Sequence, residues 1–394
     1  MSRARNLLLL TLVISLPARA DEDSYRYPWQ VGASGGSRPW HVAGEVPLTT
    51  DSGRSPTVLR YLPDGKDVIV GWADGAVERW NLESRRRTWQ VKPIDEVGAL
   101  VVNPAGDHIA VFRARHNSGN QDFAVHILDS ASGKSLAELG ARTFSPFCKG
   151  RHLYPWRAEF DREGSLYALM INESSDNQGT CHPFLDYTIV RFDPSSTQPK
   201  WHYVIPIHGA TRNPQGGYLE EGDCGVPIPS IAVGPDLIAG GACDAQVFFL
   251  DKATGKEVGR KPSPLTQYPN LPKSIVDFGG GVTNLAWAAN GKRLLVGLGT
   301  QSNGWYYPGF YDNAQQGKPG PMKILGKLSG SRGDLLLSPD EKMIAVVANE
   351  LDLFDLNSGQ LIYQTNASES QVALNPRKAE IAILGTMQIF LHRP

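Results

Sequence analysis

Short apolar runs, each ended by a polar turn, recur along this chain with a period of about forty residues. Each copy consists of an apolar strand, a turn rich in Pro, Asp and Gly, a second apolar strand, and a third strand that ends in Asp or Asn. A strand repeat of this length is typical of a β-propeller, in which each copy forms one blade. The clearest copies lie at residues 59–82, 100–129, 160–193, 231–251, 285–312 and 335–355.

The last copy is incomplete, and this predicts how the ring closes. The seventh blade begins at residues 371–374 and ends at 387–392, so the chain runs out after three strands. Residues 40–48 are a candidate for the missing fourth strand, and their pairing would cover the edge of an open array. The sequence therefore predicts an all-β fold, a seven-bladed β-propeller of four-stranded antiparallel blades, with the ring closed by an N-terminal strand.

The N-terminus has the pattern of a targeting segment. Arg3 and Arg5 precede an apolar run at residues 7–16, and Ala18-Arg19-Ala20 fits a cleavage signal. We expect residues 1–20 to be a signal peptide cut after Ala20, residues 21–54 to be an extension with the ring-closing strand, and residues 55–394 to be the propeller. The mature protein is then expected to be periplasmic or secreted, with no transmembrane segment after cleavage.

Composition narrows the class of partner. Hydrophobic residues make up 41% of the 394, and 39 Lys and Arg stand against 40 Asp and Glu, for a net charge of −1. A nucleic-acid surface needs a basic excess, so the sequence predicts no nucleic-acid partner. The expected partner is a protein or a small ligand in the periplasm.

The cysteines gain meaning from the predicted export. An even number of cysteines in an oxidising compartment favours disulfides, and four allow three connectivities. No Cys-x-x-Cys pair is present, which weighs against a zinc site and a covalently attached haem. The favoured pairing, which staples each inserted loop to its own blade, joins Cys148 to Cys181 and Cys224 to Cys243.

Several runs resemble the WD40/YVTN-type β-propellers, and specifically their exported bacterial members. The resemblance covers most of residues 55–394 and implies the propeller fold; because this fold hosts receptors, scaffolds, lactonases and dehydrogenase subunits, it does not select a function. The runs that carry it are Leu59-Arg60-Tyr61-Leu62-Pro63-Asp64-Gly65, Leu335-Leu336-Leu337-Ser338-Pro339-Asp340, Phe248-Phe249-Leu250-Asp251-Lys252-Ala253-Thr254-Gly255 and Leu353-Phe354-Asp355-Leu356-Asn357-Ser358-Gly359.

Long insertions interrupt the repeat, and all are expected on one face of blades 2–5. They span residues 113–122, 172–186 and 299–308 within blades, and 141–157, 206–229 and 261–281 between blades. Long loops on a rigid scaffold commonly carry binding, although aromatic residues in such loops also pack locally. The candidate binding residues are His152, Tyr154, Trp156, His182, Phe184, Tyr218, Glu221, Asp223, Trp305, Tyr306 and Tyr307.

No motif with the structural context of a catalytic site is found. Residues 32–36 match Gly-x-Ser-x-Gly formally but lack the strand-turn-helix setting of a nucleophile elbow. Glu220-Glu221-x-Asp223 lacks the ligand spacing of a calcium loop. We predict no catalytic residue, no metal ligand and no cofactor, with Ca²⁺ or haem left open because His116, His152, His182 and His208 fall on the inserted face.

The leading interpretation is a non-enzymatic periplasmic scaffold that binds a protein partner or ligand through the long loops of blades 2–5. The alternative is a propeller enzyme or dehydrogenase subunit, lactonase-like or quinoprotein-like, with a metal or cofactor at the central channel.

Overall fold

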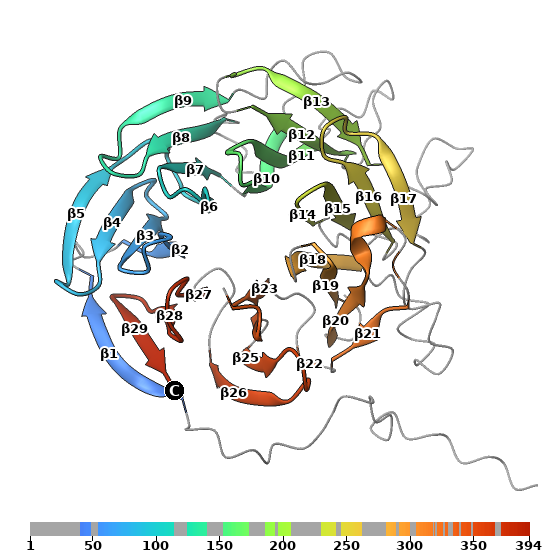
Figure 1. The fold of residues 1–394 in the computed structure, drawn as a ribbon. Coiled ribbons are helices and arrows are strands. Elements are labelled where there is room, and N and C mark those ends of the chain that lie inside the picture. The colour runs from blue at the N-terminus through green and yellow to red at the C-terminus, as the bar shows by residue number, and fades with distance from the viewer. Residues whose placement is uncertain are drawn as a thin grey trace, which may run out of the picture.

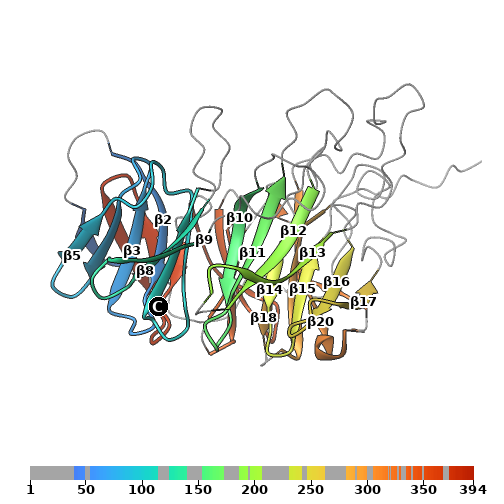
Figure 2. The same ribbon diagram turned by 90° about the horizontal axis from the view of Figure 1, so that it is seen from above.

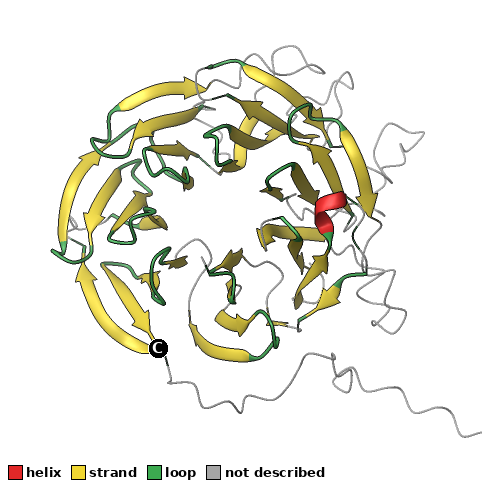
Figure 3. Ribbon diagram, in the orientation of Figure 1, coloured by secondary structure: helices red, strands yellow, loops and turns green. Residues whose placement is uncertain are grey.

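Seven antiparallel sheets stand around one axis (Figures 1 and 3). In this computed structural model, the described residues are 40–48, 54–113, 124–139, 153–172, 186–193, 196–205, 230–241, 246–261, 281–288, 291–299, 305–317, 319, 321–325, 328–329, 334–338, 340–347, 350–366 and 372–394.

Blades 1 to 4 follow the chain in order from the innermost strand outward. Blade 1 holds β2 (Pro56–Tyr61), β3 (Asp67–Trp72), β4 (Val77–Asn81) and β5 (Arg86–Val91). Blade 2 holds β6 (Ala99–Val102), β7 (His108–Phe112), β8 (Val125–Asp129) and β9 (Ser135–Leu139). Blade 3 holds β10 (Leu153–Phe160), β11 (Leu166–Asn172), β12 (Asp186–Phe192) and β13 (Pro199–Val204). Blade 4 holds β14 (Ile231–Val233), β15 (Leu237–Gly241), β16 (Val247–Asp251) and β17 (Glu257–Lys261).

Blades 5 to 7 complete the ring. Blade 5 holds β18 (Gly281–Ala288), β19 (Arg293–Gly299), β20 (Trp305–Asp312) and β21 (Lys323–Ile324), with β22 (Leu328–Ser329) also on β20 and the short 3₁₀ helix η3 (Ala314–Gln316) after it. Blade 6 holds β23 (Asp334–Leu337), β24 (Met343–Val347), β25 (Glu350–Asp355) and β26 (Leu361–Asn366). Blade 7 holds β27 (Val372–Leu374), β28 (Ile381–Leu384), β29 (Gln388–Arg393) and β1 (His41–Pro47).

The turns of the repeat form because their polar residues hold the backbone locally. In the first turn of blade 1, Asp64 accepts the backbone N–H of Lys66 at 2.8 Å, and Gly65 adopts a positive φ of 68° that side chains rarely tolerate. The Asp that ends the third strand works in the same way, since Asp251 accepts the N–H of Thr254 at 2.8 Å. The recurring Asp and Gly are therefore explained by turn geometry.

Tryptophans in the outer strands join neighbouring blades. Trp89 donates its ring N–H to the carbonyl of Ser130 at 3.0 Å, from blade 1 to blade 2. Trp201 donates to the carbonyl of Lys252 at 3.3 Å, from blade 3 to blade 4. Gly133 and Gly255, three residues after Ser130 and Lys252, leave room for the two indole rings. A Cβ added at either glycine would lie less than 3.0 Å from the ring of Trp89 or Trp201. Two blade seams thus use the same device.

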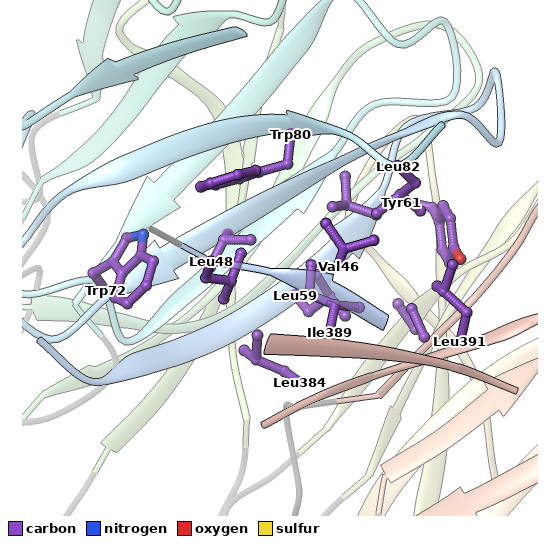
Figure 4. Close-up of a cluster of buried hydrophobic side chains, with 14 of the residues drawn as sticks. Val46, Leu48, Leu59, Tyr61, Trp72, Trp80, Leu82, Leu384, Ile389 and Leu391 are labelled. Carbon is purple, nitrogen blue, oxygen red and sulfur yellow. The ribbon is translucent and has the colours of Figure 1, made fainter. Parts of the chain in front are cut away.

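The N-terminal strand closes the ring, as the sequence predicts. β1 pairs antiparallel with β29, and the N–H of Leu48 donates to the carbonyl of Met387 at 2.8 Å. Val46 and Leu48 are buried in the core between blades 7 and 1, among side chains that include Leu59 and Ile389 (Figure 4). Blade 7 thereby gains its fourth strand, and the first and last described segments share one sheet.

A buried polar network reinforces the same seam. The Glu380 side chain of blade 7 is fully buried and accepts hydrogen bonds from Tyr61 of blade 1 at 2.9 Å and from Arg393 at 2.7 Å. Asn375 donates to Glu380 at 3.0 Å and to the carbonyl of Gly65 at 2.8 Å. Burial raises the pKa of Glu380, but the hydrogen bonds from Arg393 and Tyr61 outweigh this, so the pKa is lowered.

The two faces of the ring differ in their connections. On what we call the short-turn face, tight turns join strands one to two and three to four, as at Gly65. On the opposite, long-connection face, the second strands of blades 2 to 5 end at Phe112, Asn172, Gly241 and Gly299. Because neighbouring strands are antiparallel, successive strands of a blade end at opposite faces. The edge view shows β10 to β13 running between the two faces (Figure 2).

Two of the expected insertions are shorter than the sequence indicates. β20 begins at Trp305, so residues 305–308 of the segment 299–308 belong to a strand. β10 begins at Leu153, so residues 153–157 of the segment 141–157 also belong to a strand. Both strands contain a proline, Pro308 or Pro155, that is accommodated within the pairing.

Replacing Glu380 by Ala should weaken the seam between blades 7 and 1. The loss leaves Arg393 and Tyr61 without their buried acceptor, so we expect the free energy of unfolding to fall by about 3 kcal/mol or more at neutral pH. The loss should shrink in acid, because the folded pKa of Glu380 lies below its usual 4.5. The contribution of Glu380 to the free energy of unfolding disappears as the pH falls below 4.5 and through the folded pKa.

Urea unfolding of both proteins measures this difference. Glu163→Ala is the control, since Glu163 makes an exposed ion pair with Lys252 and should cost less than about 1 kcal/mol. Equal losses for the two variants would contradict a special role for Glu380.

Candidate functional site

Five polar side chains on the innermost strands form what we call the axial cluster. The innermost strands β2, β6, β10, β14, β18, β23 and β27 neighbour one another in sequence order and close back on β2. Most of their residues are apolar. The members of the axial cluster are Arg60 of β2, Arg157 and Glu159 of β10, Asn284 of β18 and Asp334 of β23.

Arg157 and Asp334 meet across the axis. A guanidinium Nη2 of Arg157 lies 3.5 Å from Oδ1 of Asp334, although blades 3 and 6 are not neighbours in the ring. Asn284 of blade 5 donates its amide N–H to the same Oδ1 at 2.9 Å. Because three blades contribute to one oxygen atom, these side chains must project to the centre of the ring.

Arg60 adds a second guanidinium to this group. It donates a hydrogen bond to the carbonyl of Leu59 at 2.8 Å, and in the described part of the chain no carboxylate lies within 4.0 Å of it. Its pKa is lowered, above all by burial, and the like charge of Arg157 lowers it further while Asp334 opposes the shift. Arg60 thus lies in the field of Asp334, which also pairs with Arg157.

Glu159 is the titratable member of the cluster. Its Oε2 accepts the backbone N–H of Val233, on the inner edge of blade 4, at 2.7 Å. Burial raises the pKa of Glu159 to about 7, against the opposing effects of the Val233 hydrogen bond and of the Arg157 charge. Near neutral pH this carboxyl group therefore changes between its neutral and charged forms.

Solvent reaches part of the cluster, whose members lie at different levels along the axis. Arg60 and Glu159 are next to the last residues of β2 and β10, at the short-turn face, whereas Asp334 and Asn284 lie toward the long-connection face. The side chains of Arg157 and Asp334 are 33% and 20% exposed. Asp334 is the first residue of β23 and pairs with Val347, the last residue of β24, so it lies at the end of the blade on that face. Asn284 pairs with Gly297, two residues before β19 ends. An arginine that solvent can reach, such as Arg157, can bind an anionic group.

Tyr306 and Tyr307, two predicted binding residues, are core residues. Their exposed fractions are 0% and 1%, and adjacent positions on β20 place them on opposite sides of blade 5. Tyr306 packs with Leu335 at the seam to blade 6, and Tyr307 packs with Phe249 at the seam to blade 4. Neither presents its ring to a partner at the surface.

The other predicted residues are only partly covered by the structure. Trp156 is half-buried and packs against the core between blades 3 and 4, while Tyr154 and Trp305 are placed in β10 and β20 by their backbones alone. Within the described residues, no group of three or more His, Cys, Asp or Glu side chains is suited to a metal ion. His116, His152, His182, His208, Phe184, Tyr218, Glu220, Glu221, Asp223, Cys148, Cys181, Cys224 and Cys243 lie outside the described residues.

Sequence reasoning missed the axial cluster, although a signal was present. Arg60 and Glu159 occupy the same position of their first strands, where blades 2, 4 and 7 have the apolar residues Val101, Ala232 and Ala373. The forty-residue repeat identifies these segments only as strands within blades. A charged residue on an innermost strand is the feature that points to the axis.

Comparison with known proteins supports the fold. No family model and no curated protein sequence matches the chain. Among solved structures, it is similar to the β-propeller domain of Myceliophthora thermophila Cps50 (Swd1), with a TM-score of 0.59, 16% identity, and coverage of 90% of this chain and 100% of that one. The chain therefore has a seven-bladed β-propeller fold with a WD40 propeller as a structural neighbour.

Replacing Glu159 by Gln tests the electrostatics of the axis. The folded pKa of about 7 exceeds the usual 4.5, so the folded state binds the proton more tightly and stability falls as the pH rises between these values. Gln keeps the acceptor for the Val233 N–H but never ionises, so the variant should exceed the wild type by up to about 3 kcal/mol above pH 7.

Unfolding free energies measured across this pH range decide the matter. In acid, below the unfolded pKa, the two proteins should converge. The exposed Glu138→Gln serves as the control and should follow the wild type. Parallel pH profiles for wild type and Glu159→Gln would show that Glu159 is not desolvated at the axis.

Proposed function

We propose that this protein is a non-enzymatic, exported β-propeller that binds a protein partner through the long-connection face of blades 2 to 5. The fold itself is a scaffold-like ring. The single observation that carries the proposal is the difference between the two faces. On one face, tight turns join the strands. On the other face, most consecutive strands of these blades are joined by connections of ten or more residues.

The strand register supports this arrangement on blade 3. Asn172, the last residue of β11, pairs with Asp186, the first residue of β12, so the chain leaves and re-enters the sheet at adjacent points. A two-residue hairpin would suffice to join them, yet residues 173–185 stand between. Chain length that the fold does not need is commonly retained for binding.

The ring beneath this face is suited to hold such connections in place. β11 and β15 carry almost continuous buried apolar residues, as expected for strands covered on both faces. The blade seams add apolar clusters on either side, for example Ile189 of blade 3 with Phe248 of blade 4. Connections that start and end on such strands have fixed ends, which lowers the entropy lost when a partner binds.

Export rests on the sequence of residues 1–20, with its positive start, apolar run and small-residue cleavage signal. Among the residues that the structure describes, no helix has the length and apolar character needed to cross a bilayer. An exported scaffold is expected to meet its partner outside the cytoplasm.

Shortening one connection tests the proposal. Residues 173–185 are replaced by Asn-Gly, which suits a two-residue hairpin between Asn172 and Asp186. After crosslinking in the native extracytoplasmic compartment, we expect the wild type to recover a defined protein partner and the shortened variant to lose at least about tenfold of that recovery, with an unchanged unfolding midpoint.

A double substitution on the short-turn face is the control. Lys134→Ala with Lys256→Ala alters two exposed turn residues and should leave recovery unchanged. The proposal fails if the shortened variant recovers the same partner in the same amount, or if the control loses it equally.

A further inference from the structure

While Glu159 is neutral, the axial cluster carries more positive charge than it balances, because Arg60 and Arg157 then stand against Asp334 alone. Arg60 lies close enough to Arg157 to feel its charge, and among the described residues Asp334 is the carboxylate that acts on Arg60. That carboxylate is already engaged, since its Oδ1 accepts the amide of Asn284 and lies at the long distance of 3.5 Å from Arg157. Charge placed away from bulk water without a close partner is costly.

The hydrogen-bond donors of the two arginines are also incompletely used. Each guanidinium has five N–H donors. For Arg60, the described residues supply the Leu59 carbonyl, and for Arg157 they supply Asp334. A guanidinium with unused donors matches the planar, bidentate geometry of a carboxylate or phosphate.

We propose that a small-molecule oxyanion, a carboxylate or a phosphate group, binds on the ring axis between Arg60 and Arg157. Its charge would compensate both guanidinium groups, and its oxygen atoms would accept their free N–H donors. Asp334, which accepts the amide of Asn284, competes with the ligand for Arg157 at the long distance of 3.5 Å. The ligand would reach the site through the solvent-exposed part of Arg157.

Glu159 makes this site sensitive to pH. It shares β10 with Arg157, whose charge acts on it, while the flanking strands β6 and β14 carry no charged residue. Arg60 and Asp334 are the charged members from the other innermost strands. When Glu159 is neutral, the site repels an anion less, so the oxyanion should bind more tightly below pH 7 than above it.

Isothermal titration of the purified mature chain with inorganic phosphate and, separately, with succinate tests the site. Arg60→Gln and Arg157→Gln should each weaken binding by about tenfold or more, the effect of losing one charge-assisted hydrogen bond. Arg162→Gln removes the same charge from an exposed turn and should bind as the wild type does. Binding of one probe alone assigns the site to that oxyanion class.

Two further variants keep the test decisive if an arginine variant fails to fold. Asp334→Asn removes the competing carboxylate and should tighten binding. Glu159→Gln should remove most of the affinity change for succinate across one unit on either side of pH 7. The proposal is overturned if neither probe binds the wild type, or if the folded variants of Arg60, Arg157, Asp334 and Glu159 bind the probe with the affinity of the wild type.

The site is independent of the proposed partner binding. The axial variants leave residues 173–185 intact, and shortening that segment leaves Arg60 and Arg157 in place. Loss of oxyanion binding with partner recovery retained, or the reverse, therefore separates the two proposals.

Discussion

Closure of the ring by β1 is the constraint on which the rest of this structure depends. Without β1, blade 7 would have three strands, and β29 would present an unpaired edge. With β1 in place, its pairing with β29, the burial of Val46 and Leu48, and the Glu380 network all tie blade 7 to blade 1. The contact between Arg157 and Asp334 also depends on closure, because blades on opposite sides meet at the axis only in a complete ring.

The sequence predicted those parts of the fold that depend on local chemistry. Turn residues such as Asp64 and Gly65 act within a few positions of themselves, so their pattern survives in the linear chain. Ring closure was also predictable, because the repeat left its last blade one strand short and residues 40–48 were free to supply it. The aromatic pair Tyr306 and Tyr307 was assigned to a loop because residues 299–308 interrupt the repeat in sequence, whereas β20 begins at Trp305.

The axial cluster could not be predicted by the same reasoning. Its members are spread from residue 60 to residue 334, and their proximity is a property of the ring rather than of any single blade. A repeat pattern describes what blades share, whereas function in a propeller resides where blades differ. Here the differences are of two kinds, charged residues on innermost strands and long connections on one face.

Hydrogen exchange of the backbone amides of β1 tests the closed ring most directly. If β1 is an integral strand, amides such as that of Leu48, which donates to Met387, should exchange as slowly as those of the buried strands β3 and β28, and should be released only by global unfolding. Rapid exchange throughout residues 41–48, with β3 still protected, would contradict a ring held closed by its N-terminal strand.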